Sequence, residues 1–142
     1  VQTYLQSGNL VIETDCTVSE TKQILESVFL QSFGFQIPLI VRTTAEIQQL
    51  VLENPFPEVK EGNLLYVTMF AQEISQNARQ ISLPCTGSEQ FVWKECNGYL
   101  VCPEGYGKTK MTNALLEKKT GCTATTRNWN TILAIQNMLT NT

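Results

Sequence analysis

Apolar and polar residues alternate in short periodic blocks along the first third of the chain. Between residues 17 and 33 the apolar positions return every three or four residues and Gly34 follows them, which predicts an amphipathic helix of about four turns ending at the glycine. Before it, the β-prone runs Val1–Gln6 and Leu10–Thr14 surround a glycine turn. The chain is therefore predicted to open with a hairpin and a helix.

The next two elements run up to a pair of prolines. Ile37–Arg42 is largely apolar and predicts a short buried strand. Thr43–Leu52 follows and predicts a helix capped at its first residue. Asn54–Pro57 then holds two prolines within three residues, a pattern that ends any regular element. We therefore place a boundary at residue 57.

A second set of elements follows this boundary. Its clearest signal is Asn97-Gly98 between two β-prone runs, which predicts a hairpin turn at that dipeptide. The predicted elements are strands at Leu64–Phe70, Gln90–Glu95, Tyr99–Cys102 and Cys122–Thr126, and helices at Ser75–Gln80, Lys108–Lys119 and Asn128–Leu139.

The order of these elements predicts the fold. Residues 58–142 have the β-α-β-β-α-β order of a ferredoxin-like fold and a final helix, and residues 1–57 have the same order without its opening strand and helix. We therefore expect an α+β protein of two ferredoxin-like halves packed together, the first incomplete. An incomplete half leaves an unpaired strand edge, so a homodimer is one expected state.

Composition excludes several classes of protein. The 142 residues are 42% hydrophobic and 16% charged, as in ordinary globular domains. No stretch approaches the roughly 20 apolar residues that cross a bilayer, so no membrane role is expected. There is no histidine, and the only aspartate is Asp15. Histidine-based triads, histidine-ligated metals and aspartate-centred phosphoryl transfer therefore lack their residues.

Five cysteines are scattered through the chain without a CxxC pair. An odd number at such spacing favours reduced thiols and a cytoplasmic protein. Without histidine, a zinc site would need four of these thiolates, and their scatter argues against one. We expect neither a metal nor a cofactor.

Charge is unevenly distributed although the net charge is only −3. Residues 1–93 carry four basic and ten acidic side chains, whereas residues 94–127 carry six basic and three acidic ones. The basic surplus permits an anionic partner in the last third, although a solvated basic face is the more ordinary interpretation. Nucleic acid is not expected as a partner, because the strand aromatics that could stack on bases more often form a core.

The turn after the second hairpin contains a possible anion site. Gly105, Gly107, Lys108 and Lys110 precede a predicted helix, and Gly-Lys-Thr resembles the end of a P-loop. The first P-loop glycine is replaced by Cys102, so a nucleoside triphosphatase is not expected. Glycines can still let backbone N–H groups approach an anion while the lysines add charge. The alternative is a glycine turn with solvated lysines.

A second candidate lies at the start of the last helix. Arg127 could clamp a carboxylate or phosphate there while Asn128 or Asn130 contacts a polar ligand. The alternative is structural: Asn128 caps the helix, Trp129 anchors it in the core and Arg127 binds loop carbonyls. Both interpretations are open from the sequence.

Several strings in the chain resemble a bacterial family catalogued as domain of unknown function 1697. They are Val1–Asn9, Asn54–Pro57, Gly105–Lys108, Leu115–Lys118 and above all Thr125–Thr131. The resemblance implies two ferredoxin-like halves. It also implies a further strand and helix ahead of the position equivalent to Val1, around a Leu-Arg-Gly-Ile-Asn-Val-Gly-Gly motif that this sequence lacks. It implies no activity.

These observations predict a cytoplasmic module that binds a small ligand or a partner. The alternative is an enzyme that acts on an anionic or phosphorylated substrate in a cleft between the halves, using Lys108, Lys110, Arg127 and the asparagines.

Overall fold

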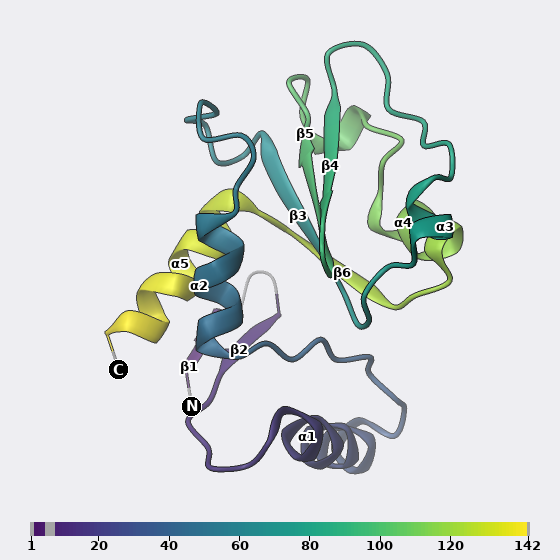
Figure 1. Ribbon diagram of the computed structural model, residues 1–142. Helices are drawn as coiled ribbons and strands as arrows, with labels where there is room; N and C mark the ends of the chain where they lie inside the picture. Colours follow the sequence, from purple (N-terminus) through teal and green to yellow (C-terminus); the bar gives the residue numbers. More distant parts are fainter. Residues whose placement is uncertain (1, 5–7, 142) are drawn as a thin grey trace.

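The computed structural model, in which residues 2–4 and 8–141 are described, is a mixed α and β protein built on a four-stranded antiparallel sheet. The strand order in this sheet is β4-β5-β3-β6, and β1 and β2 form a separate two-stranded sheet (Figure 1). The strands are β1 (Gln2–Tyr4), β2 (Asn9–Val11), β3 (Leu65–Phe70), β4 (Gln90–Lys94), β5 (Asn97–Val101) and β6 (Ala124–Asn128). The helices are α1 (Val18–Phe33), α2 (Thr44–Leu52), α3 (Gln76–Arg79), the 3-10 helix η2 (Tyr106–Lys108), α4 (Asn113–Thr120) and α5 (Trp129–Thr140).

Strand alternation sends the side chains of β3 to opposite faces of the sheet. Leu65, Val67 and Met69 pack on one face with residues of α2 and α5, in a core that also holds Tyr99. Phe70 packs on the other face with Met111 and residues of α4. Figure 1 shows α2 and α5 on one side of the sheet and α3 and α4 on the other. The sheet is therefore the middle layer of three.

Helix α2 belongs to this core although it precedes the prolines. Its start is a capping box in which Thr43 and Glu46 bond to each other's backbone N–H groups. Its buried face presents Ile47 and Leu50 to the sheet. The buried hydroxyl of Tyr99 donates to the Leu50 carbonyl at 2.7 Å, which ties β5 to α2.

The β4–β5 hairpin is present, but its turn lies two residues earlier than predicted. Lys94 pairs with Asn97, so the loop is Glu95–Cys96, and Glu95 adopts a positive φ of 52°. Gly98 lies within β5, where a Cβ would come within 2.4 Å of the Phe91 ring. The glycine is therefore required for packing across the hairpin rather than for the turn.

Helix α1 of the N-terminal region, unlike α2, presents almost no buried side chain to the core. Helix α1 begins at the Thr17 cap and ends at Gly34 in the left-handed conformation, as predicted, but Thr21 is its only buried residue. In Figure 1 it stands at the foot of the molecule, connected by extended loops. The predicted hairpin before it is present as β1 and β2, and Val1 and Leu5–Ser7 lie outside the described residues.

Two predicted elements are corrected by the structure. The strand expected at 37–42 does not form: Pro38 lacks a ladder N–H, and none of the described strands lies alongside this segment to pair with it. The helix expected from Lys108 begins only at Asn113, where Thr112 supplies the cap. Within the described part of residues 1–57, strands occur only in the two-stranded hairpin.

Candidate functional site

An open hollow of about 420 Å³ lies at the edge of the sheet where β6 has no neighbouring strand on its outer side. Strands β3 and β6, helix η2 and the start of α4 contribute its walls. The residues that line it, here called the Arg127 hollow, are Tyr66, Tyr106, Asn113, Thr125, Thr126 and Arg127.

Hydrogen bonds hold one wall of the hollow. Asn113 donates its side-chain amide to the Ala124 carbonyl at 3.0 Å and accepts from the Thr126 hydroxyl at 2.8 Å. The Tyr106 hydroxyl accepts from the Asn113 N–H at 2.9 Å. The Tyr106 ring lies beside that of Tyr66, with ring centroids 4.5 Å apart. These contacts fix the turn from η2 to α4 against β6.

Arg127 is the charged group of this hollow and is half-buried. Its Nε donates to Asn9 Oδ1 at 2.9 Å, and its Nη1 donates to the Thr126 carbonyl at 2.9 Å and to the Thr125 hydroxyl. All three partners are neutral. Burial lowers the pKa of the Arg127 guanidinium from its ordinary value, since removal from water disfavours the charged form.

No carboxylate compensates this buried charge within residues 2–4 and 8–141, where the ion pair found is Lys22–Glu26. The side chains of residues 1–7 include no acidic group either. A cation withdrawn from water is normally paired with an anion. The Arg127 hollow is therefore suited to a negatively charged group.

The glycines and lysines predicted for an anion site do not line this hollow. Gly105 has a φ of 93°, which favours glycine, and leads into η2 rather than into the N-terminus of α4. Gly107, Lys108 and Lys110 are exposed, and the ammonium groups of both lysines have no bond to any described residue. The turn reaches the hollow through Tyr106 alone.

Asn128 and Asn130 were also predicted for the anion site, but neither lines the hollow. Asn128 caps α5 by accepting from the Thr131 N–H at 2.9 Å. Asn130 is exposed, and its backbone N–H donates to the Gly62 carbonyl at 3.4 Å. Of the seven predicted residues, only Arg127 lines the hollow. Sequence reasoning missed the contributions of Tyr66, Tyr106 and Asn113, because residues that are far apart in the sequence meet there only through strand pairing.

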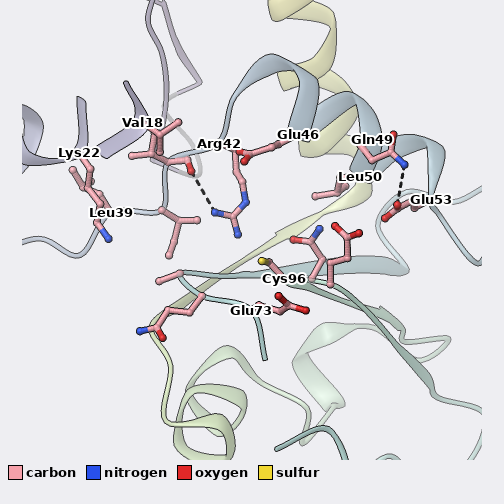
Figure 2. Close-up of a pocket in the computed structure, with 16 residues that line it drawn as sticks. Val18, Lys22, Leu39, Arg42, Glu46, Gln49, Leu50, Glu53, Glu73 and Cys96 are labelled. Carbon is pink, nitrogen blue, oxygen red and sulfur yellow. Dashed lines mark hydrogen bonds between the residues drawn. The ribbon is translucent and has the colours of Figure 1, made fainter. Parts of the chain in front are cut away.

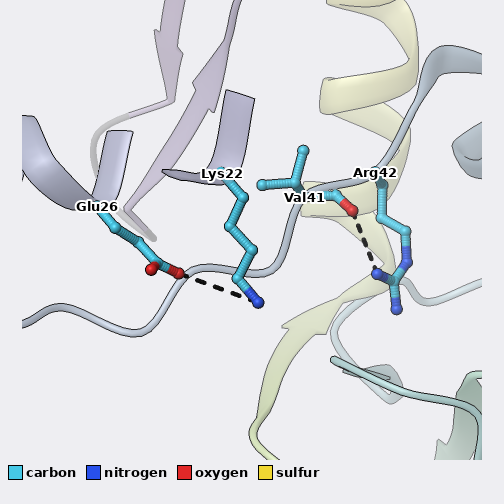
Figure 3. A network of polar contacts seen from close by, with 4 residues as sticks. All are labelled: Lys22, Glu26, Val41 and Arg42. Carbon is cyan, nitrogen blue, oxygen red and sulfur yellow. Dashed lines mark hydrogen bonds and ion pairs between the residues drawn. The ribbon is translucent and has the colours of Figure 1, made fainter. Parts of the chain in front are cut away.

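A second hollow, of about 360 Å³, lies between α2, residues 39–42 and the β4–β5 turn (Figure 2). Arg42 reaches into it toward Cys96 (Figure 2) and donates to the Val41 carbonyl (Figure 3). It also donates to the Phe70 carbonyl. Four carboxylates line it against two cations: Glu46, Glu53, Glu73 and Glu95 against Lys22 and Arg42.

The electrostatics of this Arg42 hollow differ from those around Arg127. Burial raises the pKa of the Cys96 thiol, Arg42 lowers it, and nearby glutamates raise it further. A negatively charged ligand entering here would meet an excess of carboxylates. The Arg42 hollow is therefore a poorer site for an anion than the Arg127 hollow.

The structure also shows the state of the cysteines and of the strand aromatics, the other groups considered from the sequence. All five cysteines are free thiols, as expected. Of the strand aromatics considered for base stacking, Phe70 and Tyr99 are fully buried, and Phe91 and Trp93 pack partly buried against the core beside Phe70. Within the described residues, no group of three or more cysteine or acidic side chains is placed to hold a metal ion, and no helix is long and apolar enough to span a bilayer.

Comparison with curated proteins and with solved structures finds no match to the chain. A family model does match, over residues 1–99, which include β1 to β4, end within β5 and stop before β6 and Arg127. This match covers most of the chain, and the chain therefore belongs to the family described as Protein of unknown function (DUF1697).

Proposed function

We propose that this protein binds a small ligand through an anionic group held in the Arg127 hollow. The observation that carries the proposal is the half-buried guanidinium of Arg127, which has only neutral partners and lies at an open hollow. A carboxylate or phosphate placed there would compensate the charge. Charge-assisted hydrogen bonds of this kind are roughly twice as strong as neutral ones.

The donors around Arg127 fit such a group. Its Nε and Nη1 are occupied, but Nη2 has no bond to a described residue and is available to a ligand. The hydroxyls of Tyr66 and Thr125 are further donors on the same lining. Lys108 lies two residues after Tyr106 and is exposed, so its flexible side chain would add positive charge at the rim.

The proposal is binding rather than catalysis. The lining of the Arg127 hollow contains hydroxyl groups but no carboxylate, thiol or amine that would activate one of them as a nucleophile beside the proposed anion. The enzyme alternative, with a site between the two parts of the chain, stays a prediction that turnover of a phosphorylated substrate would support.

Thermal unfolding with inorganic phosphate tests the proposal. At equal ionic strength, phosphate should raise the melting temperature of the protein more than chloride does, because ligand at 100 times its dissociation constant adds about 2.7 kcal/mol to stability. Arg127→Gln should remove this difference. The matched control is Arg79→Gln, which changes another half-buried arginine whose partners are main-chain carbonyls.

The control variant is expected to keep the full response to phosphate. An equal phosphate response in Arg127→Gln and in the unaltered protein would reject the Arg127 hollow as the site, even if phosphate binds elsewhere. Because each variant is compared with itself in chloride, a loss of basal stability on replacing Arg127 does not affect the result.

We further propose that residues 58–142 form a ferredoxin-like unit and that the protein works in the cytoplasm. The antiparallel order β4-β5-β3-β6, with helices between β3 and β4 and between β5 and β6, supports the first point. Five free thiols support the second. The division at residue 57 stays a prediction, and α2 packs across it onto the sheet.

A further inference from the structure

The hydrogen-bond register of β6 shows which of its main-chain groups face the Arg127 hollow. The N–H of Ala71, just after β3, donates to the Thr123 carbonyl, just before β6, at 2.8 Å, and this bond fixes the phase of the ladder between the two strands. Bonded and non-bonded positions alternate in an antiparallel pair, so Ala124 and Thr126 turn their N–H and carbonyl groups away from β3. These groups lie on the outer edge of β6.

Side chains of the protein itself occupy three of these four groups. Glu117 accepts from the Ala124 N–H at 3.0 Å, and Asn113 donates to the Ala124 carbonyl at 3.0 Å. Arg127 donates to the Thr126 carbonyl at 2.9 Å. A further strand, from this chain or from another molecule, would have to break these bonds to pair with the edge. The outer edge of β6 is therefore closed to strand pairing.

The fourth group, the Thr126 N–H, has no bond to any described residue. It leaves the strand on the same side as the Thr126 carbonyl, which the Arg127 guanidinium contacts. Arg127 Nη2 is a second donor without a described partner, and the Thr125 hydroxyl, which accepts from Nη1, keeps its own proton for a ligand. All three donors belong to residues that line the Arg127 hollow, and together they carry one positive charge.

We propose that the ligand of the Arg127 hollow is an aromatic carboxylate, an inference that rests on the proposed function. A carboxylate has one negative charge and two acceptor oxygens, which match the charge of Arg127 and the neighbouring Thr126 N–H. A phosphate monoester carries about −1.5 to −2 charges at pH 7, so one guanidinium compensates it only in part. Lys108 lies outside the lining. The charge balance therefore favours a carboxylate over a phosphate.

The size and lining of the hollow indicate the rest of the ligand. A carboxylate takes little more space than two water molecules of roughly 30 Å³ each, whereas the hollow has about 420 Å³. The largest apolar surfaces of the lining are the rings of Tyr66 and Tyr106, whose centroids are 4.5 Å apart and whose planes are inclined by 34°. The bond from the Asn113 N–H to the Tyr106 hydroxyl holds this pair in place. A ring attached to the carboxylate would extend it in the tilted or offset contacts that aromatic rings prefer.

Amide NMR of the isotopically labelled protein, titrated with sodium salts at constant ionic strength, tests the proposal. Benzoate should move the Thr126 amide proton downfield, because this N–H would bond to the carboxylate. Benzoate should bind on the order of tenfold more tightly than acetate, since it also buries a ring. It should bind about two- to tenfold more tightly than cyclohexanecarboxylate, which matches its charge and size but has no aromatic ring. Inorganic phosphate should bind less tightly than benzoate.

Tyrosine variants measure the part that the ring contact plays. Tyr106→Leu should remove the advantage of benzoate over cyclohexanecarboxylate, whereas Tyr106→Phe, which keeps the ring, should retain it. Tyr66→Leu replaces Tyr106→Leu if the latter does not fold. Phe35→Leu is the matched control, because Phe35 is a 61% exposed aromatic residue outside the lining, and it should change neither affinity.

The outcomes separate this inference from the proposed function. If phosphate binds through Arg127 at least as tightly as benzoate, the proposed function stands and the aromatic carboxylate is rejected. The same holds if benzoate and cyclohexanecarboxylate bind equally well, or if benzoate binds without moving the Thr126 amide. If Arg127→Gln weakens the binding of none of these anions, both the inference and the proposed function are rejected.

Discussion

Helices α1 and α5 are both amphipathic, but they meet the rest of the molecule differently. In α5, Trp129 and Ile132 are buried in the core formed with α2 and the sheet. In α1, which is four residues longer, only Thr21 is buried. Helix α5 follows β6 directly, so strand pairing places it on the sheet. Long loops join α1 to its neighbours, and no described strand provides a face for it (Figure 1).

The difference shows that an apolar helix face stabilises the protein only where another part of the structure covers it. Most helical stability in proteins comes from tertiary packing. The sheet with α2, α4 and α5 should therefore carry most of the free energy of unfolding, and α1 should open at much lower free energy. Paired substitutions in the two regions measure this contrast.

The largest contrast is expected for a matched pair of phenylalanines. Phe70→Ala should lower the free energy of unfolding by about 3–5 kcal/mol, because it empties a fully buried site between the sheet and α4. Phe33→Ala should lower it by less than about 1 kcal/mol, because its ring is largely exposed in the monomer. Urea unfolding at low protein concentration gives both values, and similar losses would show that α1 is part of the cooperative core.

A smaller contrast is expected between two cysteines, Cys102 and Cys16, in how much each contributes to the pH dependence of stability. Burial, with Glu89 nearby, raises the pKa of Cys102 from an ordinary 9.0 to about 11 despite its bond with Thr109. The unfolded thiol loses its proton first, so stability is complete below pH 9, falls as the pH rises and levels off above pH 11, a loss of roughly 3 kcal/mol. Burial of Tyr99 raises its pKa and adds to the fall at higher pH.

Urea unfolding across this pH range measures the effect. Cys102→Ala should reduce the slope of stability against pH, whatever it does to stability at neutral pH. Cys16→Ala, which removes an exposed thiol just before α1, is the control. A slope that survives in Cys102→Ala would assign the pH dependence to other groups.

The smallest contrast is between two helix caps of the same residue type. Thr43→Ala removes half of the capping box of α2 and should lower global stability by about 1 kcal/mol. Thr17→Ala removes the equivalent bond from α1. It should leave global unfolding nearly unchanged while speeding hydrogen exchange of the α1 amides. Equal effects of the two variants on global unfolding would contradict the proposed independence of α1.

The candidate site was only partly predictable. Arg127 stands out in the sequence as a cation among threonines and asparagines, and it lines the hollow. Lys108 and Lys110 were predicted to converge with it, but Lys108 ends the 3-10 helix, Lys110 lies in the segment before α4, and neither lines the hollow. Tyr66 reaches the site because β3 pairs with β6, some 60 residues away, and local patterns carry no information about such pairing.

The sequence by itself determined which segments form helices and where three of them, α1, α2 and α5, begin. Thr17, Thr43 and Asn128 cap the helices that follow them, and Gly34 ends α1, because these signals act through backbone hydrogen bonds within a few residues. Only the tertiary structure decided what each element contacts. It left residues 37–42 unpaired, placed Asn97-Gly98 in a strand under the Phe91 ring, and gave Arg127 neutral partners. Such outcomes depend on neighbours brought together by long-range packing, which no local periodicity specifies.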